Sequence, residues 1–265
     1  MPTVYTSGFY DSYRDASLKS ARKIVPHALR FSGAKSVADV GCGVGTWLRV
    51  VKDSGITDYL GVDGDYVEKH MLEIEPDRFR PHDLQQAFRA DRRFDLVLSM
   101  EVAEHLPPDR ANTFIDTLTS LGDVVLFSAA IPFQNGTNHV NEQFPDYWKD
   151  RFRERGYVVV DCLRKLVWND PDVEPWYAQN ALFFVKEERL NEYPHLAAAR
   201  ATTDESFLAL VHPKIYLLAR EDAAQKVTLA TQLDNTSLPQ ILSQLPGRFM
   251  RAVTRRFTRV NKVSL

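Results

Sequence analysis

The chain has 265 residues, of which 44% are hydrophobic and 26% are charged, and its formal net charge is −2. That length allows a full hydrophobic core in one large domain, or in one domain with an appendage. Its two cysteines, Cys42 and Cys162, lie far apart in apolar runs, a pattern that excludes a disulfide framework and paired cysteine ligands for a metal. We expect a globular protein in a reducing, cytoplasmic setting, because the apolar stretches fall far short of a bilayer span.

Charge is distributed unevenly along the chain. The last acidic residue is Asp234, and six basic residues follow it near the end: Arg248, Arg251, Arg255, Arg256, Arg259 and Lys262. Without these six, 27 basic residues stand against 35 acidic residues, a net charge of −8. An acidic body does not by itself attract nucleic acid, so a nucleic-acid partner would have to use the basic tail or a local patch.

Short β-branched runs alternate with longer helical patterns before about residue 189, which predicts an α/β fold. Seven strands are expected, at Ser36–Cys42, Tyr59–Asp63, Phe79–Asp83, Phe94–Met100, Asp123–Ile131, Tyr157–Leu163 and Ala181–Lys186. The helical patterns among them are Thr46–Ser54, Val67–Ile74, Asp109–Leu121 and Pro145–Arg155. We therefore expect the first five strands to be parallel and covered by helices on both faces. Gly55, Gly122 and Gly156 follow helical patterns, where a left-handed cap is favourable.

Three parts of the chain are predicted. Residues 1–188 form the main domain, in which the segment Ser7–Ser20 is an N-terminal lid over the expected cofactor. Residues 189–221 form a packed extension, with Val211–Leu217 as a further strand. Residues 222–265 are more polar and end in the basic tail.

A glycine cluster lies between the first predicted strand and the first predicted helix. Its members are Gly41, Gly43 and Gly45, and a turn of this kind lets backbone N–H groups and a helix N-terminus approach a ligand closely. The spacing differs from the dinucleotide pattern, whose third glycine comes one residue later, and the turn is too short for a P-loop. An NAD-dependent oxidoreductase is the alternative, although a Tyr-x-x-x-Lys set for hydride transfer is lacking.

Hydrogen-bond acceptors follow at the ends of successive predicted strands. Asp39 lies within the first strand, and Asp63 ends the second, where a carboxylate can accept both hydroxyls of a ribose. Asp83 ends the third strand, next to Leu84, where it can accept from an adenine amino group. Ser99 ends the fourth strand and offers its backbone carbonyl to an ammonium group. Together these residues predict S-adenosylmethionine (SAM) as cofactor rather than NAD.

The same strand ends carry a family resemblance. The segments Val37–Gly45, Gly61–Asp63, His82–Leu84 and Ser99–Leu106 resemble, in this order, the cofactor motifs of class I SAM-dependent methyltransferases, over roughly residues 30 to 190. With the strand pattern, this predicts a Rossmann-like, seven-stranded, mostly parallel sheet with helices on both faces, plus a C-terminal extension. The alternative is a glycine turn that only packs strand against helix, with carboxylates that only cap helices.

A second set of polar residues follows the fourth and fifth strands. Glu101, Glu104 and His105 fall within one helical turn, where residues three and four apart share a face. Two carboxylates and an imidazole can bind Mg²⁺ or Mn²⁺. His139 lies in the loop after the fifth strand, at the same edge of the expected sheet. We therefore expect the catalytic residues to be Glu101, Glu104, His105 and His139.

These two segments resemble the metal site of small-RNA 2′-O-methyltransferases, in which a Glu-x-x-Glu-His turn is joined by a later histidine. The turn also looks like that of the ubiquinone-pathway O-methyltransferases. The resemblance implies a metal held by Glu101, Glu104, His105 and His139. The spacing after His139 departs from the RNA family, and its large RNA-binding appendages have no obvious counterpart in this chain. Two alternatives remain: His139 or His105 acts directly as a base, or the charges only cap the following helix or touch the SAM amino group.

The basic tail has an amphipathic pattern. If it is helical, five apolar residues from Phe249 to Val260 share one side and most arginines lie on the other, which predicts peripheral contact of residues 247–265 with an anionic membrane. The alternative is a terminal helix docked on its own domain or on another subunit. The expected location is therefore cytoplasmic, at the inner membrane surface.

The function predicted from the sequence is an O-methyltransferase, assisted by a divalent metal, that acts on a hydroxyl of a sugar, glycan or glycosylated small molecule. Vicinal hydroxyls suit a bound cation, which can hold two neighbouring oxygens. The alternatives are 2′-O-methylation of an RNA terminus, a non-catalytic SAM-binding subunit and an NAD-dependent oxidoreductase.

Overall fold

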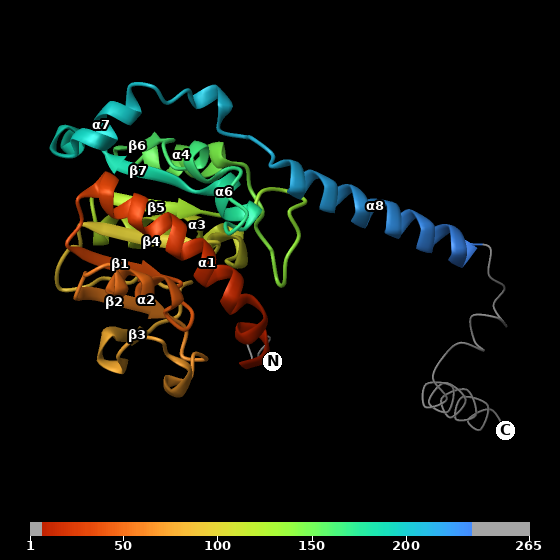
Figure 1. The fold of residues 1–265 in the computed structure, drawn as a ribbon, viewed down its shortest axis with the longest axis horizontal. Helices are drawn as coiled ribbons and strands as arrows, with labels where there is room; N and C mark the ends of the chain where they lie inside the picture. Colours follow the sequence, from red (N-terminus) through yellow and green to blue (C-terminus); the bar gives the residue numbers. More distant parts are fainter. Residues whose placement is uncertain (1–6, 235–265) are drawn as a thin grey trace, which may run out of the picture. The chain divides into compact units, whose positions relative to one another are not determined.

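The computed structural model describes residues 7–234 of the chain, with side chains for residues 15–228 and 231. Its contacts divide the chain into two units, Met1–Tyr216 and Leu217–Leu265, and each is described by itself. The first unit carries the whole of a seven-stranded sheet (Figure 1). The basic tail, including residues 247–265 and its predicted membrane face, lies outside the described residues.

The sheet confirms the predicted fold class. Its strands are β1 Ser36–Val40, β2 Asp58–Asp63, β3 Phe79–Pro81, β4 Leu96–Met100, β5 Val124–Ser128, β6 Tyr157–Val160 and β7 Leu182–Lys186. The strand order is β3-β2-β1-β4-β5-β7-β6. The first five strands are parallel, as predicted, whereas β7 runs antiparallel to both β5 and β6. The order reverses between β1 and β4, and ligands of open α/β sheets bind at the carboxyl edge of such a reversal.

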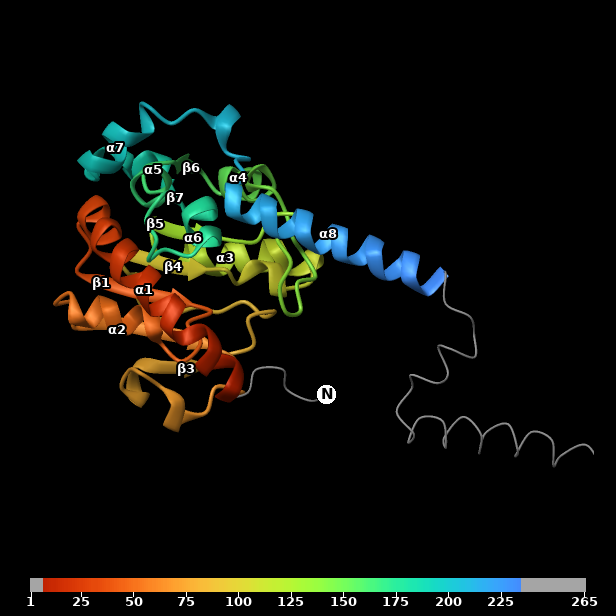
Figure 2. The same cartoon turned by 45° about the vertical axis from the view of Figure 1, so that its right-hand side comes forward.

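Helices cover both faces of this sheet. The α-helices are α1 Ser7–Ser32, α2 Thr46–Asp53, α3 Ala111–Leu121, α4 Pro145–Arg153, α5 Arg164–Val167, α6 Pro175–Asn180, α7 Pro194–Arg200 and α8 Pro213–Asp234. Short 3₁₀ turns are η1 Lys69–Met71, η2 Pro76–Arg78, η3 Ala103–His105, η4 Pro108–Arg110, η5 Glu187–Glu192 and η6 Glu205–Phe207. Figures 1 and 2 both show α1 and α2 on the same face of the sheet, where the two helices contact each other.

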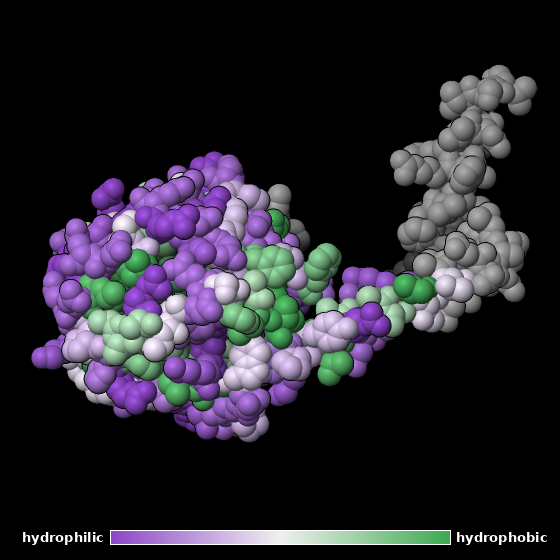
Figure 3. Space-filling model, turned by 90° about the horizontal axis from the view of Figure 1, so that it is seen from above, coloured by the Kyte–Doolittle hydropathy of each residue, from purple (hydrophilic) through white to green (hydrophobic). Residues whose placement is uncertain are grey.

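Two apolar cores lie on the two faces of the sheet, because successive side chains of a strand point to opposite sides. Along β5, Val124 and Leu126 join a cluster that includes α1 and α2, whereas Val125 and Phe127 join a cluster that includes α3 and α4. Figure 3 shows mainly hydrophilic residues on the visible face of the first unit, with hydrophobic residues in smaller patches between them. The double-sided burial explains why the strand sequences are continuous apolar runs.

One predicted helix is wrong. The segment Val67–Ile74 forms only the 3₁₀ turn η1 in the middle of an irregular stretch. Val67 and Ile74 are both buried, and Ile74 packs against the glycine turn, since a Cβ on Gly45 would lie 2.9 Å from its Cγ1. The apolar spacing that suggested a helix therefore comes from two buried residues, Val67 and Ile74, that attach a loop to the core.

One predicted helix cap is also wrong. Gly122 is extended, with φ −164° and ψ 163°, instead of left-handed. It forms a bridge with Phe94, and a Cβ at this position would lie 2.7 Å from Cγ2 of Val97. Glycine is needed there for close packing. Gly55 and Gly156 do adopt the left-handed conformation, with φ 93° and 74°.

The predicted strand Val211–Leu217 is wrong because α8 begins within it, at Pro213. Proline is favourable in the first turn of a helix, where its missing N–H would have no partner. His212 precedes it, and its Nδ1 accepts the Lys214 N–H at 3.2 Å. This bond satisfies one of the free donors of the first turn.

Hydrogen bonds hold the segment between α7 and α8 against α5 and α6. The guanidinium of Arg164 donates to the carbonyls of Leu208 at 2.7 Å and Phe207 at 3.1 Å. The His212 N–H donates to Oε1 of Gln179 at 2.7 Å.

The domain boundaries 1–188, 189–221 and 222–265 stay a prediction. The lid role of Ser7–Ser20, which forms the start of α1, stays a prediction as well. Within the described residues, no helix is long and apolar enough to span a bilayer.

Candidate cofactor and metal site

The turn between β1 and α2 requires its glycines. Gly41, Gly43 and Gly45 all have positive φ, at 86°, 54° and 89°, which side chains rarely tolerate. The Gly41 N–H donates to the carbonyl of Val62 at 2.8 Å. A Cβ on Gly41 would lie 2.4 Å from Cγ2 of Val102, so the turn passes close to the chain that follows β4. The predicted glycine turn therefore lies at the carboxyl edge, where the strand order reverses.

Asp63, predicted to bind ribose, organises this turn. Its side chain is buried, Oδ2 accepts the Gly43 N–H at 2.6 Å, and Oδ1 accepts the Gly64 N–H at 2.7 Å and the hydroxyl of Tyr66. Burial raises the pKa of Asp63, although these three hydrogen bonds favour the charged form. The carboxylate thus ties the end of β2 to the glycine turn.

Asp39 lies within β1, near Asp63 at the end of the neighbouring strand β2. It is 2% exposed, and its Oδ2 has no hydrogen-bond partner among the described residues. Burial, followed by the charge of Asp63, raises the pKa of Asp39 to about 8. This raised pKa favours the protonated form of Asp39 at neutral pH, next to the glycine turn.

The remaining predicted cofactor residues lie at the ends of β3 and β4. Asp83 is exposed and accepts the Gln85 N–H at 3.0 Å, and Leu84 packs partly buried against the apolar cluster of α3 and α4. Ser99 is fully buried, and its hydroxyl has no partner among the described residues. All three remain at the edge where they were predicted, and their contacts with a cofactor stay a prediction.

Glu101 follows β4 in a left-handed conformation, with φ 56°. Its N–H donates to both the carbonyl and the hydroxyl oxygens of Ser128, each at 3.0 Å, which joins the ends of β4 and β5. Its carboxylate accepts from Nε2 of Gln134 at 2.7 Å and from Nδ2 of Asn180 at 3.1 Å. Burial raises the pKa of Glu101, and these two amides oppose that effect.

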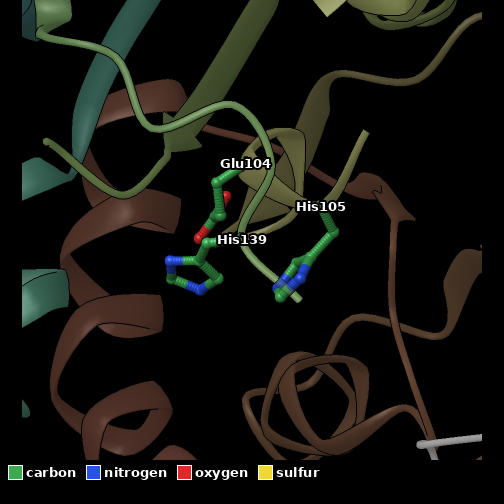
Figure 4. Close-up of side chains that lie close together, drawn as sticks. All are labelled: Glu104, His105 and His139. Atoms are coloured by element: carbon green, nitrogen blue, oxygen red, sulfur yellow. The ribbon is translucent and has the colours of Figure 1, made fainter. Parts of the chain in front are cut away.

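Three of the four predicted metal ligands come together. Glu104, His105 and His139 each offer a ligand atom within 4.8 Å of the other two (Figure 4). Glu104 is 0% exposed, and neither carboxylate oxygen has a hydrogen-bond partner among the described residues. Burial, and then the charge of Glu101, raises the pKa of Glu104 well above its usual range. Glu101 itself lies outside this group.

The two histidines of the group approach each other edge to face. The ring centroids of His105 and His139 are 4.9 Å apart, with an interplanar angle of 81°. Burial, followed by the charge of His139, lowers the pKa of His105 to about 4. At neutral pH, His105 is therefore an uncharged imidazole, the form that binds metals or accepts a proton.

In the loop between β5 and α4, His139 is fixed by a residue that does not belong to the group of three candidate ligands. Nδ1 of His139 lies 2.9 Å from Oε1 of Glu142, and Oε2 of Glu142 accepts the Phe133 N–H at 2.8 Å. Positive φ angles of 60–68° occur at Phe133, Asn135 and Asn138. Such backbone strain is found where surrounding contacts fix a functional loop.

Sequence reasoning missed the amides that surround Glu101. Asn180 donates to Oε1 of Gln134 at 2.9 Å, and Gln179 donates to Oδ1 of Asn180 at 2.9 Å. Gln179 and Asn180 end α6, one residue before β7, and because β7 is antiparallel its start lies at the carboxyl edge of β5. Two buried amides in front of an apolar strand were the available signal. The partnership of Glu142 with His139 was missed as well.

The donor set of the group fits a small divalent cation. An unpaired, fully buried carboxylate is costly unless a positive charge or a proton satisfies it, and a ligand atom of each of two imidazoles lies within 4.8 Å of a carboxylate oxygen of Glu104. One carboxylate with two imidazoles is a set that Mn²⁺ accepts more readily than Mg²⁺.

Comparison with known proteins gives one family. The model of a methyltransferase domain matches residues 10–166, more than half of the chain. No curated protein matches at a significant level.

Three of the solved structures that match this chain are the following. The methyltransferase domain of bacterial CtHen1-CN is 21% identical, with a TM-score of 0.44 over 63% of this chain and 97% of that chain. An O-methyltransferase family protein from Burkholderia thailandensis is 14% identical, with a TM-score of 0.49 over 68% of this chain and 60% of that one. DesVI from Streptomyces venezuelae is 17% identical, with a TM-score of 0.48 over 67% and 94%.

Proposed function

The chain belongs to the class I SAM-dependent methyltransferases, and on that premise we propose that it methylates a hydroxyl oxygen of a sugar or glycan with the help of a divalent cation. Glu104, His105 and His139 would hold the cation. The family match favours this reading over the NAD-dependent oxidoreductase, the alternative from another enzyme class.

One observation carries the proposal. Glu104 is completely buried with both oxygens unpartnered, and two imidazoles lie within 4.8 Å at the edge of the sheet that also holds the glycine turn. The two imidazoles are groups that can share a cation or a proton with Glu104.

Different residues would act on the methyl donor and on the acceptor hydroxyl. The glycine turn, with Asp63 and Asp39, binds and orients SAM, which supplies an electrophilic methyl group. A neutral hydroxyl is a poor nucleophile, so its proton must be taken up as the methyl group is transferred. A cation held by Glu104, His105 and His139 would lower the pKa of that hydroxyl. His105, uncharged at neutral pH, is available to bind the cation or accept the proton.

Sugar acceptors suit the surroundings of this group. A cation can hold two neighbouring oxygens, an arrangement that vicinal hydroxyls of a sugar provide. Phe133, Val140 and Phe144, which are 79%, 57% and 45% exposed, lie in the same loop as His139 and offer apolar surface for the face of a sugar ring. The ribose at an RNA terminus carries the same pair of hydroxyls, so RNA methylation remains the second candidate.

The test uses the full-length protein freed of metal by chelation. Methyl transfer from labelled SAM is measured with a panel of sugars, glycans and an RNA that ends in a 2′,3′-diol, with and without Mn²⁺ or Mg²⁺. We expect metal-dependent methylation of a sugar, its loss in His139→Ala, and full activity in His195→Ala, which changes an exposed histidine outside the group. Undiminished transfer by the metal-free protein would show that no cation is needed, and transfer to RNA alone would establish the second candidate.

A further inference from the structure

The pair formed by His139 and Glu142 is placed unlike an ordinary surface ion pair. The two residues are three apart in sequence, but they lie in a loop without helical structure. Their side chains are only 12% and 20% exposed, and Nδ1 of His139 lies 2.9 Å from Oε1 of Glu142. The imidazole is therefore held in one orientation by a shielded carboxylate.

The carboxylate of Glu142 is itself fixed. Its second oxygen, Oε2, accepts the backbone N–H of Phe133 at 2.8 Å. Phe133 has φ 68°, a conformation that a bulky residue rarely adopts without such support. Glu142 thus joins both ends of the loop, and the backbone bond prevents its free rotation away from His139.

The hydrogen bond determines which ring nitrogen carries the proton. An ionised carboxylate accepts hydrogen bonds and donates none, so Nδ1 of an uncharged His139 must hold the hydrogen. The lone pair is then on Nε2. The imidazole packs closely against Gly136, since a Cβ at that position would lie 2.2 Å from Nε2.

We propose that Glu142 is a positioning residue that keeps His139 as the Nδ1–H tautomer and thereby presents Nε2 as a ligand or proton acceptor for methyl transfer. This inference rests on the proposed function, in which His139 takes part. It holds for both readings of that function, because a metal ligand and a general base need the same lone pair. Carboxylates that fix metal-binding histidines in this way are conserved nearly as well as the ligands themselves.

The same molecule provides an internal reference of the opposite tautomer. Nδ1 of His212 accepts the Lys214 N–H at 3.2 Å, and its Nε2 lies 2.9 Å from the carbonyl oxygen of Trp168. His212 must therefore carry its hydrogen on Nε2. The nitrogen chemical shifts of the two histidines should accordingly be reversed.

The test is a long-range proton–nitrogen NMR spectrum of the full-length protein labelled with ¹⁵N-histidine, recorded at about pH 8, where an ordinary imidazole is uncharged. His139→Ala and His212→Ala assign the two signals. We expect the Nδ1–H pattern for His139 in the wild type and its loss in Glu142→Ala. Asp146→Ala, which removes an exposed carboxylate nearby, should leave the pattern unchanged.

Glu142→Gln serves as the second variant if Glu142→Ala does not fold. Its single amide oxygen can accept from His139 or from Phe133 but not fully from both, so a mixture of tautomers is expected. An Nε2–H pattern for His139 in the wild type, or an unchanged Nδ1–H pattern in both variants, would overturn the assignment.

Metal affinity separates this inference from the proposed function. Calorimetry with Mn²⁺ alone should show affinity lower by about 10- to 100-fold in Glu142→Ala than in the wild type. If the wild type binds no Mn²⁺ but shows the Nδ1–H pattern, cation assistance fails and the positioning role of Glu142 stands. If Mn²⁺ binds equally to both proteins, the positioning role fails and the metal site stands.

Discussion

Nδ2 of Asn180 donates to Oε1 of Glu101 at 3.1 Å, which connects the end of α6 to the residue after β4 across 79 residues of sequence. Together with Gln134, this amide satisfies the carboxylate that the sequence assigned to the metal. Glu104 is fully buried and Glu101 is partly buried, and side-chain amides donate hydrogen bonds to Glu101 but not to Glu104. The two acidic residues of the Glu-x-x-Glu-His turn therefore have different environments.

Removal of the Asn180 amide should destabilise the protein. In Asn180→Ala, Glu101 and Gln134 each lose a buried partner, and we expect the free energy of unfolding to fall by about 1–3 kcal/mol. Urea denaturation measures this change. Asn191→Ala, at an exposed position of η5, is the matched control and should cost far less. Equal stability of the two variants would mean that the amides contribute little.

Asp63 is expected to determine SAM affinity. Asp63→Asn keeps the size of the side chain but removes an acceptor from the glycine turn and from the ribose that it is predicted to bind. Calorimetry with SAM should show binding weakened by about 1–3 kcal/mol. The exposed Asp65, two residues later, gives the control variant Asp65→Asn, which should bind SAM as the wild type does. Unchanged affinity in Asp63→Asn would refute its cofactor role.

Asp39 should make stability depend on pH. Its pKa is raised by burial from 3.8 to about 8 in the folded chain, so between these values the folded chain holds a proton that the unfolded chain releases. The stabilising contribution is therefore complete at low pH and is lost as pH rises towards 8. Asn mimics the protonated form, so Asp39→Asn should lose less stability over this range.

Calorimetric melting of the SAM-free protein at several pH values between 5 and 8 checks this expectation. The difference in Tm between Asp39→Asn and the wild type should increase with pH. Asp63, whose pKa is also raised, remains in both proteins and affects both curves. Parallel curves would show that Asp39 is ionised in the folded chain throughout.

The sequence predicted the sheet better than it predicted the site. The seven strands and the parallel direction of the first five follow from apolar runs that each carry their own signal, and the glycines of Gly41–Gly45 mark the turn. The surroundings of Glu101 could not be obtained in this way, because Asn180 reaches it only through the antiparallel pairing of β7 with β5. That pairing is a property of tertiary packing. The irregular stretch around η1 was mistaken for a helix because two buried anchors imitate helical spacing.

Arg164 should hold the segment that leads into α8. Arg164 is 2% exposed, and its guanidinium donates to the carbonyls of Leu208 and Phe207, to that of Gln179 at 3.3 Å, and to Oδ2 of Asp161 at 2.6 Å. A lysine at this position has one compact ammonium group and cannot match the planar fork that serves several acceptors.

Arg164→Lys should therefore expose the backbone of residues 205–212 to solvent more often, and hydrogen exchange followed by mass spectrometry should show faster exchange there. The cofactor edge lies on β1, β2 and β4, so SAM affinity should change little. Lys165→Arg, at the exposed neighbouring position, controls for the exchange of one basic side chain for another. Exchange in residues 205–212 that stays as slow as in the wild type would mean that Leu208, fully buried in the core, holds the segment without help from Arg164.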